Sequence, residues 1–209
     1  MGVDIEAPLR TFLEDVASQK PTPGGGSVAA LAGALAAGLT SMVCRLTIGK
    51  ERYKEVWGEM EHLLEESEKV RSSLQHLITE DALAYDAVSQ ALKMDRSTSE
   101  AKEKRREAFQ QALRGAAEVP METGRRCLDL LSTVREVAGK GNTNALSDAG
   151  VAAHLALAAF HGALLNVDIN LSSIKAADYV AETRERMEAM AREAVEIHSL
   201  VLEVLRTRL

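Results

Sequence analysis

Apolar residues recur at helical spacing along most of the chain. They mark a short amphipathic helix within residues 9–19 and three longer helices at about residues 52–94, 100–137 and 177–209. Each longer pattern carries charged residues on the face opposite the apolar one. Alternation typical of strands does not extend beyond a few residues. The pattern therefore predicts an all-α, single-domain bundle of about six to eight long helices over residues 1–209.

Two further segments, residues 28–44 and 145–174, are apolar almost all the way round. A helix without a polar face has to be covered on every side, so we expect both to be buried. The first segment repeats small residues every four positions, which lets another helix approach closely: Ala29, Gly33, Ala37 and Ser41. It is slightly short for a membrane span and is rich in alanine and glycine. This favours a buried helix in a central layer, which a homodimer could share.

Three interruptions separate these helices. Ser27 is a candidate N-cap for the segment that runs to about Thr47, and Ser97 or Ser99 could cap the helix after "DRSTSE". Pro120 lies inside the next helical pattern, where the loss of a backbone donor predicts a kink or a restart. The stretch "AGKGNTNALSD" then ends that helix.

Composition narrows the class of protein. Hydrophobic residues make up 46% and aromatic residues 3%, which indicates a core of small and aliphatic side chains. The net charge of -6 and the lack of a long basic block argue against a nucleic-acid binder. Cys44 and Cys127 each lie in a helical pattern, as expected of free, buried thiols in a reducing compartment. Because the start "MGVDIE" does not resemble a secretory signal, we expect a cytoplasmic protein.

The first candidate site is the turn "PTPGGGS", in which Pro23, Gly24, Gly25 and Gly26 lead to Ser27. Glycines free the backbone to take positive φ, and the following helix presents unpaired N–H groups and a positive dipole end. Such a place can bind an anion or a carbonyl-rich ring. A tight turn between two helices is the alternative, although it needs fewer than three glycines.

The stretch "EDALAYDA" is a second candidate. Tyr85 lies four residues after Asp81 and shares its helix face, and Asp86 is flanked by small alanines. A carboxylate in such surroundings could lie in a pocket and transfer protons. The alternative is a solvated helix surface.

The third candidate is "GKGNTNALSDAG", where polar side chains crowd the start of an apolar helix. Lys140, Asn142, Asn144 and Asp148 belong to this group. Helix capping is the alternative, but one serine or aspartate would satisfy it. The number of polar groups therefore favours a site.

Two smaller groups are candidates for substrate binding. Asn166 and Asn170 lie four apart on an otherwise apolar helix, and buried amides need partners that a helix or a ligand could supply. Arg45 and Lys50 belong to a local basic group that could hold an anionic tail, although compensation of the helix C-terminus is the simpler explanation. His154 lies seven residues before another histidine, but nothing supplies the remaining ligands of a metal site.

Taken in order, these stretches resemble the cyclodeaminase half of formiminotransferase-cyclodeaminase. The segments that carry the resemblance are "PTPGGGSVAALAGALAAGL", "DALAYDAV", "VPMET", "KGNTNALSDAGVAA" and "LNVDINL", and they extend over about residues 9–189. Small free-standing bacterial relatives are called formimidoyltetrahydrofolate cyclodeaminases or methenyltetrahydrofolate cyclohydrolases. Asp168 departs from the pattern and is given no role. A formiminotransferase activity would have to lie on another chain.

The resemblance implies an all-α homodimer that holds a tetrahydrofolate derivative in a groove between helices. No metal or redox cofactor is implied. The glycine turn would approach the ring system, and Arg45 and Lys50 would hold the glutamate tail. Asp86 and Asp148 would supply acid–base catalysis and charge stabilisation, while Lys140 and Asn142 would orient the substrate.

Three functions stay open at this point. A cyclodeaminase converts 5-formiminotetrahydrofolate to 5,10-methenyltetrahydrofolate and ammonia, and the resemblance favours this activity. A cyclohydrolase would open the methenyl ring with water at the same site. A non-catalytic, folate-binding helical dimer is the third, and it would be favoured if Asp86 and Asp148 were far apart or exposed to solvent.

Overall fold

A computed structural model describes residues 3–208 and contains helices but no strand within that range. Six α-helices and two short 3-10 helices follow one another, which confirms the predicted all-α bundle. Their bounds are α1 (Leu9–Val16), α2 (Gly25–Thr47), η1 (Glu51–Val56), α3 (Trp57–Lys93), α4 (Ser99–Lys140), η2 (Thr143–Ala145), α5 (Leu146–Leu171) and α6 (Ala177–Arg208).

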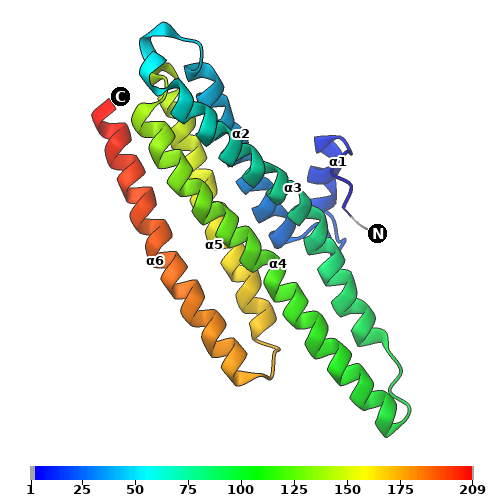
Figure 1. Ribbon diagram of the computed structural model, residues 1–209. Helices are drawn as coiled ribbons and strands as arrows, with labels where there is room; N and C mark the ends of the chain where they lie inside the picture. The colour runs from blue at the N-terminus through cyan, green and yellow to red at the C-terminus, as the bar shows by residue number, and fades with distance from the viewer. Residues whose placement is uncertain (1–2, 209) are drawn as a thin grey trace.

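The five long helices run up and down along a common direction, as Figure 1 shows. Helix α2 packs against α3, α4 and α5, and α4 packs against α3, α5 and α6. Helix α1 lies beside the first half of α2, to which the glycine turn connects it (Figure 1). The α2–α3 connection and the α4–α5 connection therefore lie at the same end of the bundle, and the glycine turn lies toward the other end.

The small residues of α2 face inward. A Cβ added at Gly33 would lie 2.8 Å from Cys127 Sγ and 3.0 Å from a methyl carbon of Leu74. Farther along, Ser41 Oγ and Ser67 Oγ are 2.8 Å apart. The predicted close approach therefore takes place within the chain, against α3 and α4. Both cysteines are free and buried, as expected.

The sequence mispredicts the N-cap residues of two helices, α2 and α4. Helix α2 begins at Gly25 with Gly24 as its N-cap, so Ser27 lies inside the first turn and the capping prediction is wrong. Thr98 caps α4, accepting from the Ala101 amide at 3.1 Å, rather than either neighbouring serine. Pro120 is buried inside α4, which continues without a restart because packing on both sides offsets one missing hydrogen bond.

Complete burial of the two apolar helices is wrong for a single chain. One side of each stays uncovered, and we call this surface the α2/α5 face. Its most exposed members are Val28 (39% exposed), Leu35 (55%) and Leu46 (41%) on α2, and Val151 (50%), Leu165 (71%) and Ile169 (68%) on α5. By length and composition, segments Gly25–Thr47 and Thr143–Leu171 could also cross a membrane, a test that buried bundle helices pass as well.

Candidate functional site

The glycine turn is fixed by a carboxylate from another helix. Asp81 of α3 accepts two hydrogen bonds on Oδ2, from Ser27 N and from Ser27 Oγ, each 2.8 Å long. The Ser27 hydroxyl also lies 3.2 Å from the Ile78 carbonyl oxygen. Because the first turn of a helix leaves its N–H groups without partners, Asp81 supplies the acceptor that a local N-cap would otherwise provide.

Close approach requires a glycine at position 26 and leaves little room for a side chain at position 25. A Cβ at Gly26 would lie 2.0 Å from Asp81 Oδ1, and a Cβ at Gly25 would lie 3.2 Å from the Asn166 side-chain nitrogen. Positive φ, the reason expected from the sequence, does not apply, since Gly49 is the one glycine with positive φ among residues 3–208. The missing side chains let a carboxylate and an amide reach the start of α2.

Asp81 is the functional candidate that the sequence reasoning left out. Burial raises the pKa of its carboxyl above the usual value, against the lowering effect of the two bonds from Ser27. The pairing with Gly26 spans more than fifty positions, so no local motif shows it. The one signal in the sequence was the shared face of Asp81 and Tyr85.

Asp86 lies on the same part of α3. It lines a cavity of about 330 Å³ together with Pro23, Thr22 and Lys20. Pro23 is buried and follows a cis peptide bond. The Tyr85 side chain is 45% exposed. The structure therefore places Pro23 and Asp86, two of the residues predicted for substrate binding and catalysis, on the lining of one cavity.

Asn166 and Asn170 lie at the same end of the bundle. Asn166 donates to the Gly162 carbonyl at 2.8 Å, and its amide is the group that Gly25 approaches. Asn170 donates to the carbonyl oxygens of Ala116, at 2.9 Å, and Asn166, at 2.8 Å, and so ties α5 to α4. We define the glycine-turn cluster as Gly24–Ser27, Asp81, Asp86 and Asn166.

The remaining predicted residues form a second group at the other end. Asn142 is 3% exposed, and its polar atoms have partners within the protein. Its backbone amide donates to Thr47 Oγ1 at 2.9 Å, its side chain donates to the Leu46 carbonyl at 2.8 Å, and its Oδ1 accepts from the Asn144 amide at 3.1 Å. These bonds hold the α4–α5 connection against the end of α2, which is a structural role.

Lys140 is also engaged within the chain. Its ammonium pairs with Glu136 at 2.7 Å and with Glu59, and these hydrogen bonds raise its pKa. Arg45 pairs with Glu68 at 3.3 Å, whereas Lys50 is exposed. Asp148 is half-buried in the first turn of α5 and has no side-chain hydrogen bond or ion pair with residues 3–208.

One chain does not bring the two groups together. Asp148 and Asn166 belong to the same helix and are eighteen positions apart, which corresponds to ~27 Å. Asp86 lies at the same end of the bundle as Asn166. It therefore cannot act on the same substrate atom as Asp148 of its own chain. The glycine-turn cluster supplies two carboxyl groups, a helix N-terminus and a cavity, which suits acid–base chemistry on a polar ring.

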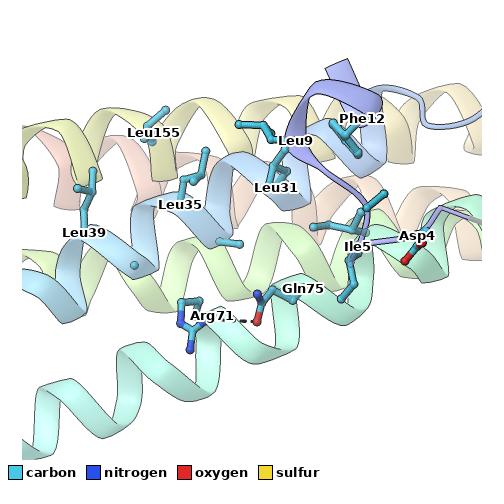
Figure 2. A pocket seen from close by; sticks show the side chains of 14 residues that line it. Asp4, Ile5, Leu9, Phe12, Leu31, Leu35, Leu39, Arg71, Gln75 and Leu155 are labelled. Carbon is cyan, nitrogen blue, oxygen red and sulfur yellow. Dashed lines mark hydrogen bonds between the residues drawn. The ribbon is translucent and has the colours of Figure 1, made fainter. Parts of the chain in front are cut away.

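A larger, mostly apolar cavity of about 600 Å³ lies beside α1, and Figure 2 shows its lining. Leu9 and Phe12 of α1 face Leu31 and Leu35 of α2 across it, and Leu155 of α5 closes one edge. It carries few polar groups, so the smaller cavity beside Asp86 is the better candidate for chemistry. Within residues 3–208, no three histidine, cysteine or acidic side chains gather as a metal site.

Comparisons with known proteins bear on this arrangement. The family model described as formiminotransferase-cyclodeaminase matches residues 8–189. A methenyltetrahydrofolate cyclohydrolase of Methylorubrum extorquens is 39% identical over 96% of each chain. A formimidoyltransferase-cyclodeaminase of Sus scrofa is 34% identical over 98% of this chain, which spans 38% of that longer protein. The crystal structure of a formiminotetrahydrofolate cyclodeaminase from Thermotoga maritima matches with a TM-score of 0.88 and 34% identity, covering 97% of both chains.

Proposed function

Since this chain belongs to the formiminotransferase-cyclodeaminase family of folate one-carbon enzymes, we propose that it opens or closes the ring of 5,10-methenyltetrahydrofolate at the glycine-turn cluster. The observation that carries the proposal is that Asp81 binds Ser27 at the turn, while Asp86, five positions along α3, lines a cavity together with Pro23 of the same turn. Both reactions of the family pass through a tetrahedral carbon beside nitrogen, where positioned carboxyl groups stabilise charge and move protons.

Cyclohydrolase is our first candidate. The relative from Methylorubrum extorquens, whose name states this activity, matches the chain over nearly its whole length. Water would attack the methenyl carbon while a base takes one of its protons. The bond from that carbon to N5 would then break as N5 is protonated, leaving 10-formyltetrahydrofolate. This ranking reverses the preference that the motifs suggested.

Cyclodeaminase is the second candidate, and the relative from Thermotoga maritima favours it. N10 would attack the formimino carbon on N5, and the tetrahedral centre would lose ammonia after protonation of the leaving nitrogen. The reacting carbon is the same in both reactions, so one arrangement of carboxyl groups serves either. The two reactions differ in the small molecule exchanged at that carbon: the cyclohydrolase adds water, whereas the cyclodeaminase releases ammonia.

The two carboxyl groups have different environments and therefore different roles. Asp86 lines the cavity, so we assign it the base that accepts a proton from water or from N10. Asp81 is held by two hydrogen bonds from Ser27, so it is suited to fix the turn, and burial raises the pKa of its carboxyl above the usual value. Neither role requires a metal or a redox cofactor, and we propose none.

The expected partners remain proposals. We propose a homodimer, because the α2/α5 face leaves leucine and isoleucine side chains uncovered in one chain. We also propose a formiminotransferase as a partner, because the name of the relative from Sus scrofa joins that activity to the cyclodeaminase in one longer chain. A cytoplasmic location stays a prediction from the sequence.

The test is a near-ultraviolet assay, since methenyltetrahydrofolate absorbs there and neither open form does. Catalysed loss of added methenyltetrahydrofolate would support the cyclohydrolase, and its formation from 5-formiminotetrahydrofolate with release of ammonia would support the cyclodeaminase. Asp86→Asn should lower turnover at least about tenfold. Asp95→Asn, an exposed change in the connection between α3 and α4, is the matched control. A folded wild type silent in both assays would overturn the proposal in favour of folate binding without catalysis.

A further inference from the structure

Two histidines from different helices are in direct contact, away from the glycine-turn cluster. His154 of α5 and His198 of α6 face each other where these helices run side by side (Figure 1). The distance from His198 Nε2 to His154 Nδ1 is 3.1 Å, and the ring centroids are 4.9 Å apart with their planes at 60°. On α5, His154 lies twelve positions before Asn166, or ~18 Å along the helix. The pair is therefore separate from the folate reaction, for which no metal is proposed.

The packing of α6 against α5 fixes the separation of these two rings. The helices are antiparallel, and a Cβ added at Gly150 would lie 3.2 Å from a methyl carbon of Leu205. Toward the other end of α5, Arg184 Nε lies 3.6 Å from Asp168 Oδ1. The two histidines lie in register between these contacts. Because the backbone is held on both sides of the pair, the fold keeps the two imidazoles together.

The contact between the imidazoles is the one polar interaction that either ring makes with residues 3–208. Neither ring forms an ion pair with a carboxylate in this range, and the second nitrogen of each ring has no protein partner there. A neighbouring carboxylate would favour the charged imidazolium, whereas neutral imidazole is the form that binds metal ions. The pair therefore consists of two donors suited to a metal.

The separation of the two nitrogens matches that of two ligands on one metal ion. Imidazole nitrogen binds Zn²⁺ at about 2.0–2.1 Å, so two nitrogens that meet at about 90–109° are about 2.8–3.4 Å apart. The observed 3.1 Å lies within this range without movement of either helix. The rings have to turn so that both lone pairs point at the ion. The ring that donates the hydrogen bond gives that proton to water and takes another on its second nitrogen, so the pair stays neutral.

We propose that His154 Nδ1 and His198 Nε2 chelate one divalent transition-metal ion, with water in its remaining coordination positions. The residues three positions before each histidine are exposed valines, Val151 (50%) and Val195 (48%), which cannot bind an ion. The site thus has two protein ligands, in keeping with the absence of any group of three among residues 3–208. Imidazole pairs suit Ni²⁺, Cu²⁺ and Zn²⁺, whereas Mg²⁺ and Ca²⁺ prefer oxygen ligands.

An ion at this site joins α6 to α5. The two histidines are 44 positions apart in the chain, so the unfolded state does not hold them at chelating distance. The ion therefore binds the folded state in preference and stabilises it. This stabilisation does not depend on the folate reaction, so it can be tested even if neither folate assay gives a signal.

Thermal unfolding with and without Ni²⁺ tests the site. The chain, prepared without a histidine tag and freed of metal with EDTA, should show a Tm that rises with added NiCl₂ at pH 7.5. The rise should reach about 5–10 °C when free Ni²⁺ is at ~100 times its dissociation constant. MgCl₂ at the same concentration should leave the Tm unchanged. A wild type whose Tm does not respond to Ni²⁺ would overturn the proposal.

Variants place the ion at the histidine pair. Each variant is compared with and without Ni²⁺, so a lower basal stability does not affect the result. His154→Ala and His198→Ala should lose most of the Ni²⁺-dependent rise. His198→Gln keeps a side chain that can hydrogen-bond to His154 but lacks the imidazole, and it should behave in the same way. His161→Ala, which removes an exposed histidine of the same helix, is the matched control and should keep the full rise. A rise that persists in His198→Ala, or is lost in His161→Ala, would contradict the chelate.

Cu²⁺ reports its ligands directly. With one equivalent of Cu²⁺, the electron paramagnetic resonance spectrum of the wild type should show splitting from two imidazole nitrogens. His198→Ala should show splitting from one at most. The same splitting in both proteins would place the ion elsewhere and refute the assignment.

Discussion

The contact between Gly26 and Asp81 allows a sharp test of how the site is built. Replacing Gly26 with alanine places a Cβ 2.0 Å from Asp81 Oδ1 and 2.5 Å from the carboxyl carbon. Ordinary van der Waals contact begins near 3.4 Å, so the carboxylate has to move by more than an ångström. Such a shift breaks the two 2.8 Å hydrogen bonds from Ser27.

The expected cost follows from these contacts. A hydrogen bond to a charged acceptor contributes about 1.5–3 kcal/mol, and because both bonds end on one oxygen we take about 3–4 kcal/mol for the pair. Alanine returns up to about 1 kcal/mol as the better helix former. The net loss in the free energy of unfolding is then about 2–3 kcal/mol, or roughly 4–12 °C in Tm for a chain of this length.

Urea unfolding followed by circular dichroism would measure the change. Gly58→Ala is the matched control, because Gly58 is also the second residue of its helix and no atom lies within 4 Å of its added Cβ. This control should be neutral or slightly stabilising. Gly26→Ala should also be harmless in an Asp81→Ala background, which gives a coupling free energy of about 3 kcal/mol between the two positions.

A Gly26→Ala variant as stable as Gly58→Ala would contradict this prediction. An equal cost of Gly26→Ala in the wild-type and Asp81→Ala backgrounds would also contradict it, because the cause would then lie outside the contact with the carboxylate. The Gly26→Ala variant should also lose turnover, because the turn borders the proposed site.

Three further predictions concern other parts of the chain. Asn142→Ala should lower the free energy of unfolding by about 2–4 kcal/mol, because it removes the hydrogen bonds of a buried side chain to the Leu46 carbonyl and the Asn144 amide; a loss below 1 kcal/mol in urea unfolding would contradict the structural role. Burial raises the pKa of Cys44 to about 11 and that of Cys127 to about 12, so iodoacetamide at pH 8 should label them after unfolding and not before, as mass spectrometry would show. Hydrogen bonds from Arg71 and Ser41 lower the pKa of Glu68 to about 2, so its contribution to stability is present above pH ~4.5 and is lost as the pH falls toward 2. Glu68→Gln should therefore be less stable than wild type at pH 6, by about 1 kcal/mol or less because the pair is partly exposed, and the two should converge near pH 2; a constant difference would refute the assignment.

The helices were predictable because their pattern is local. Apolar residues three or four positions apart define each helix, and the sequence predicted α3 and α6 nearly to their ends. Helix caps were less predictable, because their partners can be distant. Ser27 has the right chemistry for an N-cap, but its hydroxyl bonds to Asp81, fifty-four positions away, and Gly24 takes the cap position.

Burial of the two apolar helices was predictable only in part. The composition of α2 and α5 indicated that every side would be covered, whereas the chain leaves one side of each helix exposed. The hydrogen-bond partners of Asn142 were not predictable from the sequence either. A crowd of polar side chains at a helix start suggested a ligand. In the structure the backbone amide of Asn142 donates to Thr47 Oγ1 and its side-chain amide donates to the Leu46 carbonyl, ninety-five and ninety-six positions earlier in the chain.

In contrast, the order of the helices was enough to predict that the glycine turn and the "GKGNTN" stretch lie at opposite ends of the bundle. A bundle of antiparallel helices joined by short connections reverses direction at each connection. The glycine turn opens α2, and the "GKGNTN" stretch follows α4 two reversals later, so the two stretches must lie at opposite ends. The same count places Asn166, near the end of α5, back at the glycine turn, as observed. Helix order therefore divides the polar motifs into two groups, one at each end of the bundle.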